Sequence, residues 1–482
     1  MITFEEAKEL SKGYKVVPIS MEIMSDIRTP MQVLRILKGV SSHCYMLESV
    51  ENQEKWGRYT FLGYDPKLEI TCTNGVMTVK NGKTEVSEVK HPGEKIKEIL
   101  KEYTSPKIKE LPTFTGGLVG YFSYDYIKYS EPKLNLDAND EEGFKDVDLM
   151  LFDKVIAFDN FSQKIIVIAN ARTENLREDY DRCVDEINKI IELIRTGEMV
   201  EVNPGKITSE FRPLFTEKEY CEMVEKAKHY IYEGDIFQVV LSNRLEADYE
   251  GSLLNAYRVL RTINPSPYMF YFSSDDIEVA GASPETLVKL EDGVLHTFPL
   301  AGTKPRGKNK EEDDEFEKIL LTDEKERAEH NMLVDLGRND IGKISKFGTV
   351  EVENYMDILR YSHVMHIGST VKGEIRDDKT SLDAVDAVLP AGTLSGAPKI
   401  RAMEIINELE NNKRGIYGGA IGYIDFTGNL DTCIAIRTAF KKNGKVFVRS
   451  GAGIVADSVP EKEYEECINK AKAVRRALEM AQ

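Results

Sequence analysis

Glutamates in two separate segments have a spacing that suits metal binding. Glu326 and Glu329 stand three residues apart, and Glu463 and Glu466 repeat that spacing later in the sequence. Residues three apart share one face of a helix, so two such faces that meet would gather four carboxylates. Carboxylate oxygens suit Mg²⁺, which usually takes one or two of them and shares its remaining coordination with water and an anionic substrate. Such pairs are also common on solvated helices, so the surrounding sequence has to decide.

Three glycine-containing segments in the same half of the chain are able to bind an anion. They are Ala301-Gly302-Thr303, Ala391-Gly-Thr-Leu-Ser-Gly396 and Gly451-Ala452-Gly453. Because glycine lacks a Cβ, backbone N–H groups there can approach an anion closely. His366 is a candidate for proton transfer, since histidine titrates near neutral pH. The sequence has no Gly-x-Ser-x-Gly or Gly-x-Cys-x-Gly elbow, which argues against hydrolysis through a covalent serine or cysteine.

The overall charge argues against one broad class of function. The 482 residues include 64 basic and 82 acidic side chains, which gives a formal net charge of −18. This charge repels phosphate backbones and argues against nucleic-acid binding. No apolar run approaches the roughly 20 residues that span a bilayer, and the first residues lack a signal-peptide pattern. The cysteines have no metal-binding spacing and favour reduced thiols, so we expect a cytoplasmic protein with no membrane partner.

Turn dipeptides and periodicity indicate the elements that position these residues. Hairpins are expected at Asn74-Gly75, Asn81-Gly82, Asp292-Gly293, Gly428-Asn429 and Asn443-Gly444. Thr216 and Glu219 predict a capping box, and helices are expected at about 174–196, 252–262, 310–338, 398–410 and 460–480. Hairpin strands interrupted by blocks of helix indicate an α+β fold with antiparallel sheets. The aperiodic segment 197–213 places a boundary between domains 1–200 and 201–482.

Seven motifs in order resemble the chorismate-utilising enzymes. They are Ala282-Ser-Pro-Glu285, Pro299-Leu-Ala-Gly-Thr303, Glu329-His-Asn-Met-Leu-Val-Asp-Leu336, Val364-Met-His366, Leu389-Pro-Ala-Gly-Thr-Leu-Ser-Gly-Ala-Pro398, Arg414-Gly-Ile-Tyr417-Gly-Gly and Gly451-Ala-Gly453. The similarity covers essentially the whole chain and implies a two-domain α/β sandwich with antiparallel sheets flanked by helices. Within the family the chain is most similar to anthranilate synthase component I. That likeness implies a Mg²⁺-dependent lyase that makes anthranilate and pyruvate from chorismate and ammonia, the first step of tryptophan biosynthesis.

Two positions separate the branches of this family. Relatives that add water carry a lysine general base where this chain has Gln238, and an amide cannot deprotonate water. Aminodeoxychorismate synthases commonly place a nucleophilic lysine where Ala301 stands. Both residues favour the direct addition of ammonia.

The resemblance also implies roles for individual residues. Glu285 would protonate the departing ring hydroxyl, and His366 would help to remove a proton as pyruvate leaves. Glu329 and Glu466 would bind Mg²⁺ directly, with Glu326 and Glu463 supporting them. Arg437 would clamp the enolpyruvyl carboxylate. The expected contacts with chorismate are Gly302, Thr303, Thr393, Tyr417, Arg437, Gly451, Ala452, Gly453 and Lys470.

A separate pair of segments is similar to the tryptophan site of the family. The segments are Met46-Leu-Glu48-Ser49 and Asn264-Pro-Ser-Pro267-Tyr268-Met269. The family pattern usually begins with leucine, so Met46 is a departure that leaves Glu48 and Ser49 intact. Pro-Ser-Pro-Tyr is also compatible with a simple turn before a strand. The likeness implies a regulatory N-terminal domain and feedback inhibition by tryptophan.

The resemblance further implies a partner that supplies ammonia. This partner would be a glutamine amidotransferase subunit, component II of anthranilate synthase, and the assembly would be a hetero-oligomer. Two alternatives remain open. The first is aminodeoxychorismate synthase component I, and Ala301 argues against it. The second is a non-catalytic tryptophan-sensing subunit, and the presence of all the proposed metal ligands and of the proposed acid argues against it.

Overall fold

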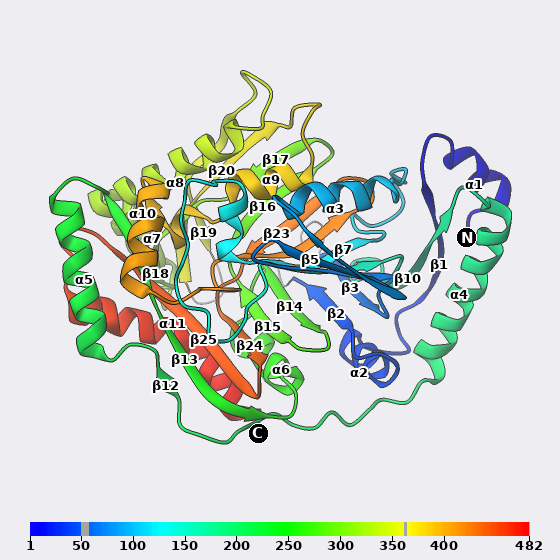
Figure 1. Cartoon of the computed structure of the whole chain (residues 1–482), viewed down its shortest axis with the longest axis horizontal. Coiled ribbons are helices and arrows are strands. Elements are labelled where there is room, and N and C mark those ends of the chain that lie inside the picture. Colours follow the sequence, from blue (N-terminus) through cyan, green and yellow to red (C-terminus); the bar gives the residue numbers. More distant parts are fainter. Residues whose placement is uncertain (50–56, 361–363, 482) are drawn as a thin grey trace.

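Two large antiparallel sheets form the centre of the molecule, shown in Figure 1 as a computed structural model that describes residues 1–49, 57–360 and 364–481, without the side chain of Thr303. The first sheet has the strand order β1 (Val16–Met24), β10 (Lys164–Arg172), β9 (Lys154–Asp159), β3 (Tyr59–Tyr64), β2 (Cys44–Glu48), β14 (Tyr268–Ser273), β15 (Glu278–Ser283), β24 (Thr438–Lys442), β25 (Lys445–Ile454), β13 (Gln238–Glu250) and β11 (Lys206–Ile207). Two short strands, β12 (Arg212–Pro213) and β21 (Gly396–Ala397), also pair with β13.

The second sheet has the order β18 (Leu300–Pro305), β20 (Val364–Glu374), β17 (Val294–Thr297), β16 (Thr286–Glu291), β23 (Leu430–Ile434), β22 (Ala420–Asp425), β7 (Gly117–Phe122), β8 (Val147–Phe152), β4 (Leu68–Thr73), β5 (Val76–Asn81) and β6 (Lys83–Glu88). An additional strand, β19 (Glu351–Arg360), pairs with β20.

The inner faces of the two sheets pack on each other through a core of aromatic side chains. Tyr45 and Phe270 of the first sheet join Tyr121, Phe152 and Ile421 of the second in one buried cluster. The alternation of side chains along each strand leaves the opposite faces apolar as well, and these must be covered by helices.

Helices cover the outer face of each sheet. The first sheet is covered by α1 (Phe4–Leu10), α2 (Pro30–Val40), α4 (Leu176–Thr196), α6 (Leu254–Ile263) and α11 (Pro460–Met480). The second is covered by α3 (Pro92–Lys101), α8 (Glu324–Gly342) and α9 (Ser381–Val388). The helices α5 (Glu217–Tyr232) and α10 (Lys399–Glu410) pack near β13, and α7 (Lys310–Thr322) packs near β18. The result is a helix–sheet–sheet–helix arrangement, which confirms the expected α+β fold.

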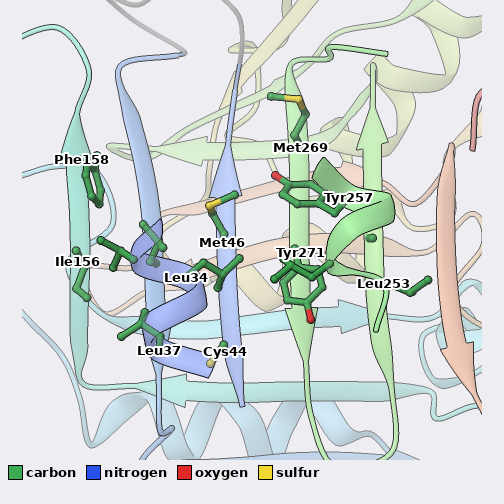
Figure 2. Close-up of a cluster of buried hydrophobic side chains, with 14 of the residues drawn as sticks. Leu34, Leu37, Cys44, Met46, Ile156, Phe158, Leu253, Tyr257, Met269 and Tyr271 are labelled. Atoms are coloured by element: carbon green, nitrogen blue, oxygen red, sulfur yellow. The ribbon is translucent and has the colours of Figure 1, made fainter. Parts of the chain in front are cut away.

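Figure 2 shows how α2 and α6 cover the centre of the first sheet. Leu34 and Leu37 of α2 lie over the strand that carries Met46, while Tyr257 of α6 lies close to Tyr271 of β14. The rings of Tyr257 and Tyr271 have centroids 5.9 Å apart. This packing buries β2 and β14, the two strands that carry the segments expected to bind tryptophan.

Both sheets cross the expected boundary between residues 200 and 201. In the first sheet Glu48 of β2 pairs with Met269 of β14, and in the second Gly117 of β7 pairs with Asp425 of β22. The boundary itself falls between α4 and β11. The two halves are therefore joined by hydrogen-bonded strands, and their division into regulatory and catalytic parts stays a prediction.

Local signals in the sequence agree with the elements observed. Each predicted turn dipeptide joins two paired strands, as at Asn443-Gly444 between β24 and β25, where both residues have positive φ. The capping box at Thr216 and Glu219 is present at the start of α5. The expected helix 310–338 is divided at Asp323, which caps α8 by accepting hydrogen bonds from Lys325 and Glu326. None of the helices in the described ranges is apolar over a length sufficient to cross a membrane.

Candidate active site

Glu285 lies in the connection between β15 and β16, where its carboxyl group is enclosed. Its Oε1 accepts a hydrogen bond of 2.9 Å from the Thr393 hydroxyl, which is presented by the short 3-10 helix η2 (Gly392–Leu394). Burial raises the pKa of Glu285 to about 7, against the opposing effects of the Thr393 hydrogen bond and the charges of Arg437 and Lys470. A carboxyl group that is partly protonated near neutral pH is suited to act as a general acid.

Arg437 faces Glu285 from the connection between β23 and β24. Its backbone has φ of +51°, a left-handed conformation that is uncommon for a residue with a side chain and that clusters at functional sites. In the described part of the chain its guanidinium forms no hydrogen bond or ion pair, and burial lowers its pKa while Glu285 opposes that change. A half-buried guanidinium of this kind is prepared to bind a carboxylate from outside the chain.

His366 is held by a bulge in the neighbouring strand. The register between β18 and β20 shifts between Ala301 and Lys304, and within this bulge Gly302 has φ of +64°. His366 Nδ1 lies 2.8 Å from the Gly302 carbonyl oxygen. Because a carbonyl only accepts, Nδ1 carries the proton and the neutral ring keeps its lone pair on Nε2. Burial lowers the pKa of His366, which favours this neutral, basic form at pH 7.

The strand β25 brings Gly451, Ala452 and Gly453 against three other predicted residues. Lys470 Nζ donates to the Gly451 carbonyl oxygen at 3.1 Å, and a Cβ at Gly451 would lie 2.9 Å from the Tyr417 hydroxyl. A Cβ at Gly453 would lie 2.7 Å from Gln238 Nε2. Glycine is therefore required at position 451, where a Cβ would also lie 2.6 Å from the Leu241 carbonyl oxygen, whereas at position 453 a Cβ would meet only the end of the Gln238 side chain.

The remaining predicted contacts lie on β18. Ala301 is buried and pairs with Ile367 of β20, directly before the bulge that binds His366. The backbone of Thr303 continues β18, but its side chain lies outside the described residues. A Cβ at Gly302 would lie 3.0 Å from Glu326 Oε2, so the bulge directly adjoins the glutamates of α8.

The two glutamate pairs face each other from α8 and α11. Burial and then the neighbouring charge of Glu326 raise the pKa of Glu329, and Glu466 contributes in the same direction. Burial also raises the pKa of Glu463, again with a contribution from Glu466. Lys470 pairs with Glu466 at 2.8 Å. Carboxylates that repel one another in this way are suited to share a divalent cation.

The spacing of these glutamates is wider than that of another cluster in the described residues. His43, Glu69 and Asp275 have ligand atoms that all lie within 4.8 Å of one another. Lys80 Nζ lies 3.9 Å from the Glu69 carboxylate and 3.6 Å from that of Asp275. Lys80 already offsets part of this charge, and the hydrogen bond to Glu69 raises the pKa of His43, so we assign no ion to the second cluster.

Glu410 belongs to a buried network that sequence reasoning missed. Its carboxylate accepts hydrogen bonds from Arg414 at 2.6 Å, from Arg449 at 2.8 Å and from the backbone N–H of Ser242 at 2.7 Å. Arg414 also donates to the carbonyl oxygen of Leu394 at 2.6 Å. Leu394 follows Thr393 in η2, so the network fixes the segment whose hydroxyl binds Glu285. No helix periodicity marks this pair in the sequence, because α10 ends at Glu410 and Asn411 follows it in the left-handed conformation, so Arg414 reaches Glu410 from outside the helix.

Glu410→Ala is expected to lower the free energy of unfolding by about 3–5 kcal/mol, because it leaves two buried guanidinium groups without their carboxylate. Urea denaturation followed by circular dichroism measures this loss. The matched control is Glu404→Ala on the same helix, where the carboxylate is half exposed and the expected change is within about 0.5 kcal/mol. Equal losses in the two variants would contradict the role given to Glu410.

A separate cavity of about 370 Å³ contains all the residues predicted to bind tryptophan, namely Glu48, Ser49, Pro267, Tyr268 and Met269. Its lining also includes the rings of Tyr59, Phe61 and Tyr423 and the charged side chains of Lys289, Glu291 and Asp431. The Glu48 carboxylate is already paired within the chain, since it accepts from Tyr257 at 2.5 Å and from Arg261 at 2.6 Å. Aromatic walls with charges of both signs fit an aromatic amino acid.

The fold and the first site define a class of protein. A family model described as chorismate binding enzyme matches residues 42–476. Anthranilate synthase component 1 of Acetivibrio thermocellus is 48% identical, covering 99% of this chain and 98% of its own length. That of Aquifex aeolicus (strain VF5) is 46% identical, covering 100% and 98%. The crystal structure of anthranilate synthase component I from Streptococcus pneumoniae TIGR4 matches with a TM-score of 0.77 and 39% identity, covering 94% of this chain and 98% of that one.

The chain therefore belongs to the chorismate-binding enzymes and, within them, to the anthranilate synthase component 1 family. This confirms the family expected from the seven motifs.

Proposed function

We propose that this protein converts chorismate and ammonia to anthranilate, pyruvate and water. The observation that carries the proposal is the grouping of Glu285, whose pKa is raised to about 7, with the half-buried Arg437 guanidinium. The names of the relatives support the same reaction. Gln238 and Ala301 supply neither a base for water nor a nucleophile, which leaves ammonia to attack the ring.

The side chains divide the reaction between an acid and a base. Glu285 donates its proton to the ring hydroxyl that leaves as water, while ammonia adds two carbons away. His366, with its lone pair on Nε2, helps to take the ring proton as pyruvate departs and the ring becomes aromatic. Arg437 holds a carboxylate of the substrate by paired hydrogen bonds, and Lys470 contributes a second positive charge.

We propose that Glu329 and Glu466 hold Mg²⁺, with Glu326 and Glu463 supporting them. The mutual repulsion among these carboxylates and their position beside Gly302 support this assignment. The bound ion would supply Lewis-acid polarisation of the substrate carboxylate. Lys470 pairs with Glu466 and places a compensating charge at the edge of the group.

We also propose that the 370 Å³ cavity binds tryptophan and that its occupancy inhibits the reaction. Tyr268→Ala is expected to weaken tryptophan binding by about tenfold or more, because it removes a ring from the cavity wall and its hydrogen bond to Asp431. Isothermal calorimetry with free tryptophan measures the change, and circular dichroism shows that the variant is folded. An unchanged affinity would mean that tryptophan binds elsewhere.

The central experiment supplies the purified chain with chorismate, Mg²⁺ and ammonium chloride and monitors anthranilate fluorescence, with EDTA as the control. Formation of anthranilate supports the proposal. An aminodeoxychorismate product would identify the first alternative, and no turnover together with tryptophan binding would identify the non-catalytic sensor. We also propose a cytoplasmic location, a glutamine amidotransferase partner and a hetero-oligomer. Of these, the name component 1 of the relatives supports only the existence of a partner.

A further inference from the structure

The aromatic cavity and the catalytic acid share one pair of strands. Lys289 of β16 and Cys433 of β23 line the cavity. Glu285 directly precedes β16, and its carbonyl oxygen accepts a hydrogen bond of 3.0 Å from the N–H of Ile434, the residue after Cys433. A ligand that moves this strand pair therefore also moves Glu285.

A chain of hydroxyl groups makes the connection more direct. Tyr268, which lines the cavity, donates its single proton to Asp431 Oδ1 at 2.8 Å. The contact of 3.0 Å between the Tyr268 hydroxyl and Thr286 Oγ1 must then be donated by Thr286. Thr286 is the residue after Glu285. One hydrogen bond and one peptide unit thus connect Tyr268, in the cavity wall, to the acid.

Strand β16, which begins at Thr286, has an irregular register directly after that residue. Thr286 pairs with Cys433 and Val288 pairs with Thr432, so the register of β16 against β23 shifts between Thr286 and Val288. A bulge bends the strand and interrupts the ladder, which lets the Glu285–Thr286 peptide shift while the following pairs remain intact.

Thr393, which donates to the Glu285 carboxylate, is held in place by other residues. Thr393 belongs to η2, which Arg414 and Glu410 hold through the carbonyl of Leu394. A shift that starts in the cavity would therefore move Glu285 and leave Thr393 in place. Misplacement of a reacting group by about 1 Å can cost about 10²-fold in rate.

We propose that Thr286 is a positioning residue that couples the cavity to the catalytic acid. Tyr268 holds the Thr286 hydroxyl in the unliganded cavity, and an amino acid that displaces Tyr268 releases Thr286 and separates Glu285 from Thr393. The identity of the ligand and of the reaction rests on the proposed function above.

The experiment compares Thr286→Val with Thr432→Val. Each substitution replaces one threonine of the same strand pair by a residue of equal shape without a hydroxyl. Thr432 donates to the Val288 carbonyl and does not take part in the contacts that connect the cavity to Glu285. For each enzyme, kcat/KM for chorismate is measured at fixed ammonium and Mg²⁺, without tryptophan and at saturation. Calorimetry gives the tryptophan Kd in the absence of chorismate.

In the native protein and in Thr432→Val, saturating tryptophan is expected to lower kcat/KM by a common factor within the about 5- to 150-fold range of allosteric coupling. In Thr286→Val that factor is expected to fall to about 3 or less, while the tryptophan Kd changes by less than about threefold. Full inhibition of Thr286→Val, or equal loss of inhibition in both variants, overturns the proposal.

Failure of the proposed function is recognised separately, as absence of anthranilate or of tryptophan binding in the native protein. The coupling is then still tested by the ¹⁹F resonance of 3-fluorotyrosine introduced at position 268. Thr393→Val, which removes the hydroxyl bound to Glu285, is expected to shift this resonance in the native background and to leave it in place when Thr286 is also valine. The absence of a shift in the native background overturns the connection.

Discussion

Glu285→Gln is expected to lower kcat/KM for chorismate about 10²- to 10⁴-fold, the usual contribution of a general acid. Glutamine keeps the size of the side chain and can still accept from Thr393, so the loss reports the proton and not the packing. Ammonia-dependent anthranilate formation measures the effect. Glu353→Gln on β19, an exposed carboxylate paired with Lys372, serves as the control and should retain full activity. A Glu285→Gln enzyme within threefold of the native rate would contradict the assignment.

The pH dependence provides a second test of the same group. The competent form of a general acid is protonated, and the pKa of Glu285 is raised to about 7 by burial, so kcat/KM should decline as the pH rises through about 7. The free ammonia concentration must be held constant across the series. Thr393→Val should move this decline to higher pH, because the Thr393 hydrogen bond lowers the pKa of Glu285. A decline that stays at the same pH would show that another group titrates.

Glu329→Gln is expected to raise the Mg²⁺ concentration for half-maximal activity by about 10²-fold or more, since loss even of a residue that only supports a metal ligand costs 10- to 100-fold. The carboxylate of Glu329 is half-buried beside that of Glu326. Anthranilate formation over a Mg²⁺ series measures the change, and Mn²⁺ binding followed by electron paramagnetic resonance measures affinity without turnover.

The matched control for the proposed metal site is Glu324→Gln at the exposed start of α8. It removes one negative charge from the same helix but not from the face that meets α11. Its Mg²⁺ requirement should stay within about twofold of the native value, because an exposed charge is largely screened. If both variants shift equally, the effect is one of net charge and Glu329 is not a ligand.

Several parts of the fold could be predicted because their causes are local. The hairpins at Asn74-Gly75 and Asn443-Gly444 depend on residues that accept positive φ, and the start of α5 depends on a capping box within four residues. Strand order was not predictable in this way. The pairing of β2 with β14 joins residues more than 200 positions apart, and such pairing is decided by the burial of both faces of a sheet.

The candidate site shows the same division. The types and order of Glu285, His366, Arg437 and the glycine segments were readable in the sequence, and they indicated the family. The sequence did not reveal that burial raises the pKa of Glu285, because that shift depends on segments that enclose it from distant positions. Glu410 was missed for a related reason. A glutamate near the end of a helix is usually solvated, and only the two arginines that converge on it make it structural.

The two glutamate pairs show what the sequence and the tertiary structure each determine. The sequence by itself determined that Glu326, Glu329, Glu463 and Glu466 lie on helix faces, since a spacing of three places side chains on one side of an α-helix. Only the tertiary structure decided that these faces lie together, beside Gly302 and close enough to Lys470 for its charge to act on Glu329. The physical reason is that helix periodicity acts within a few residues, whereas the approach of α8 to α11 depends on how both sheets pack and bury their apolar faces.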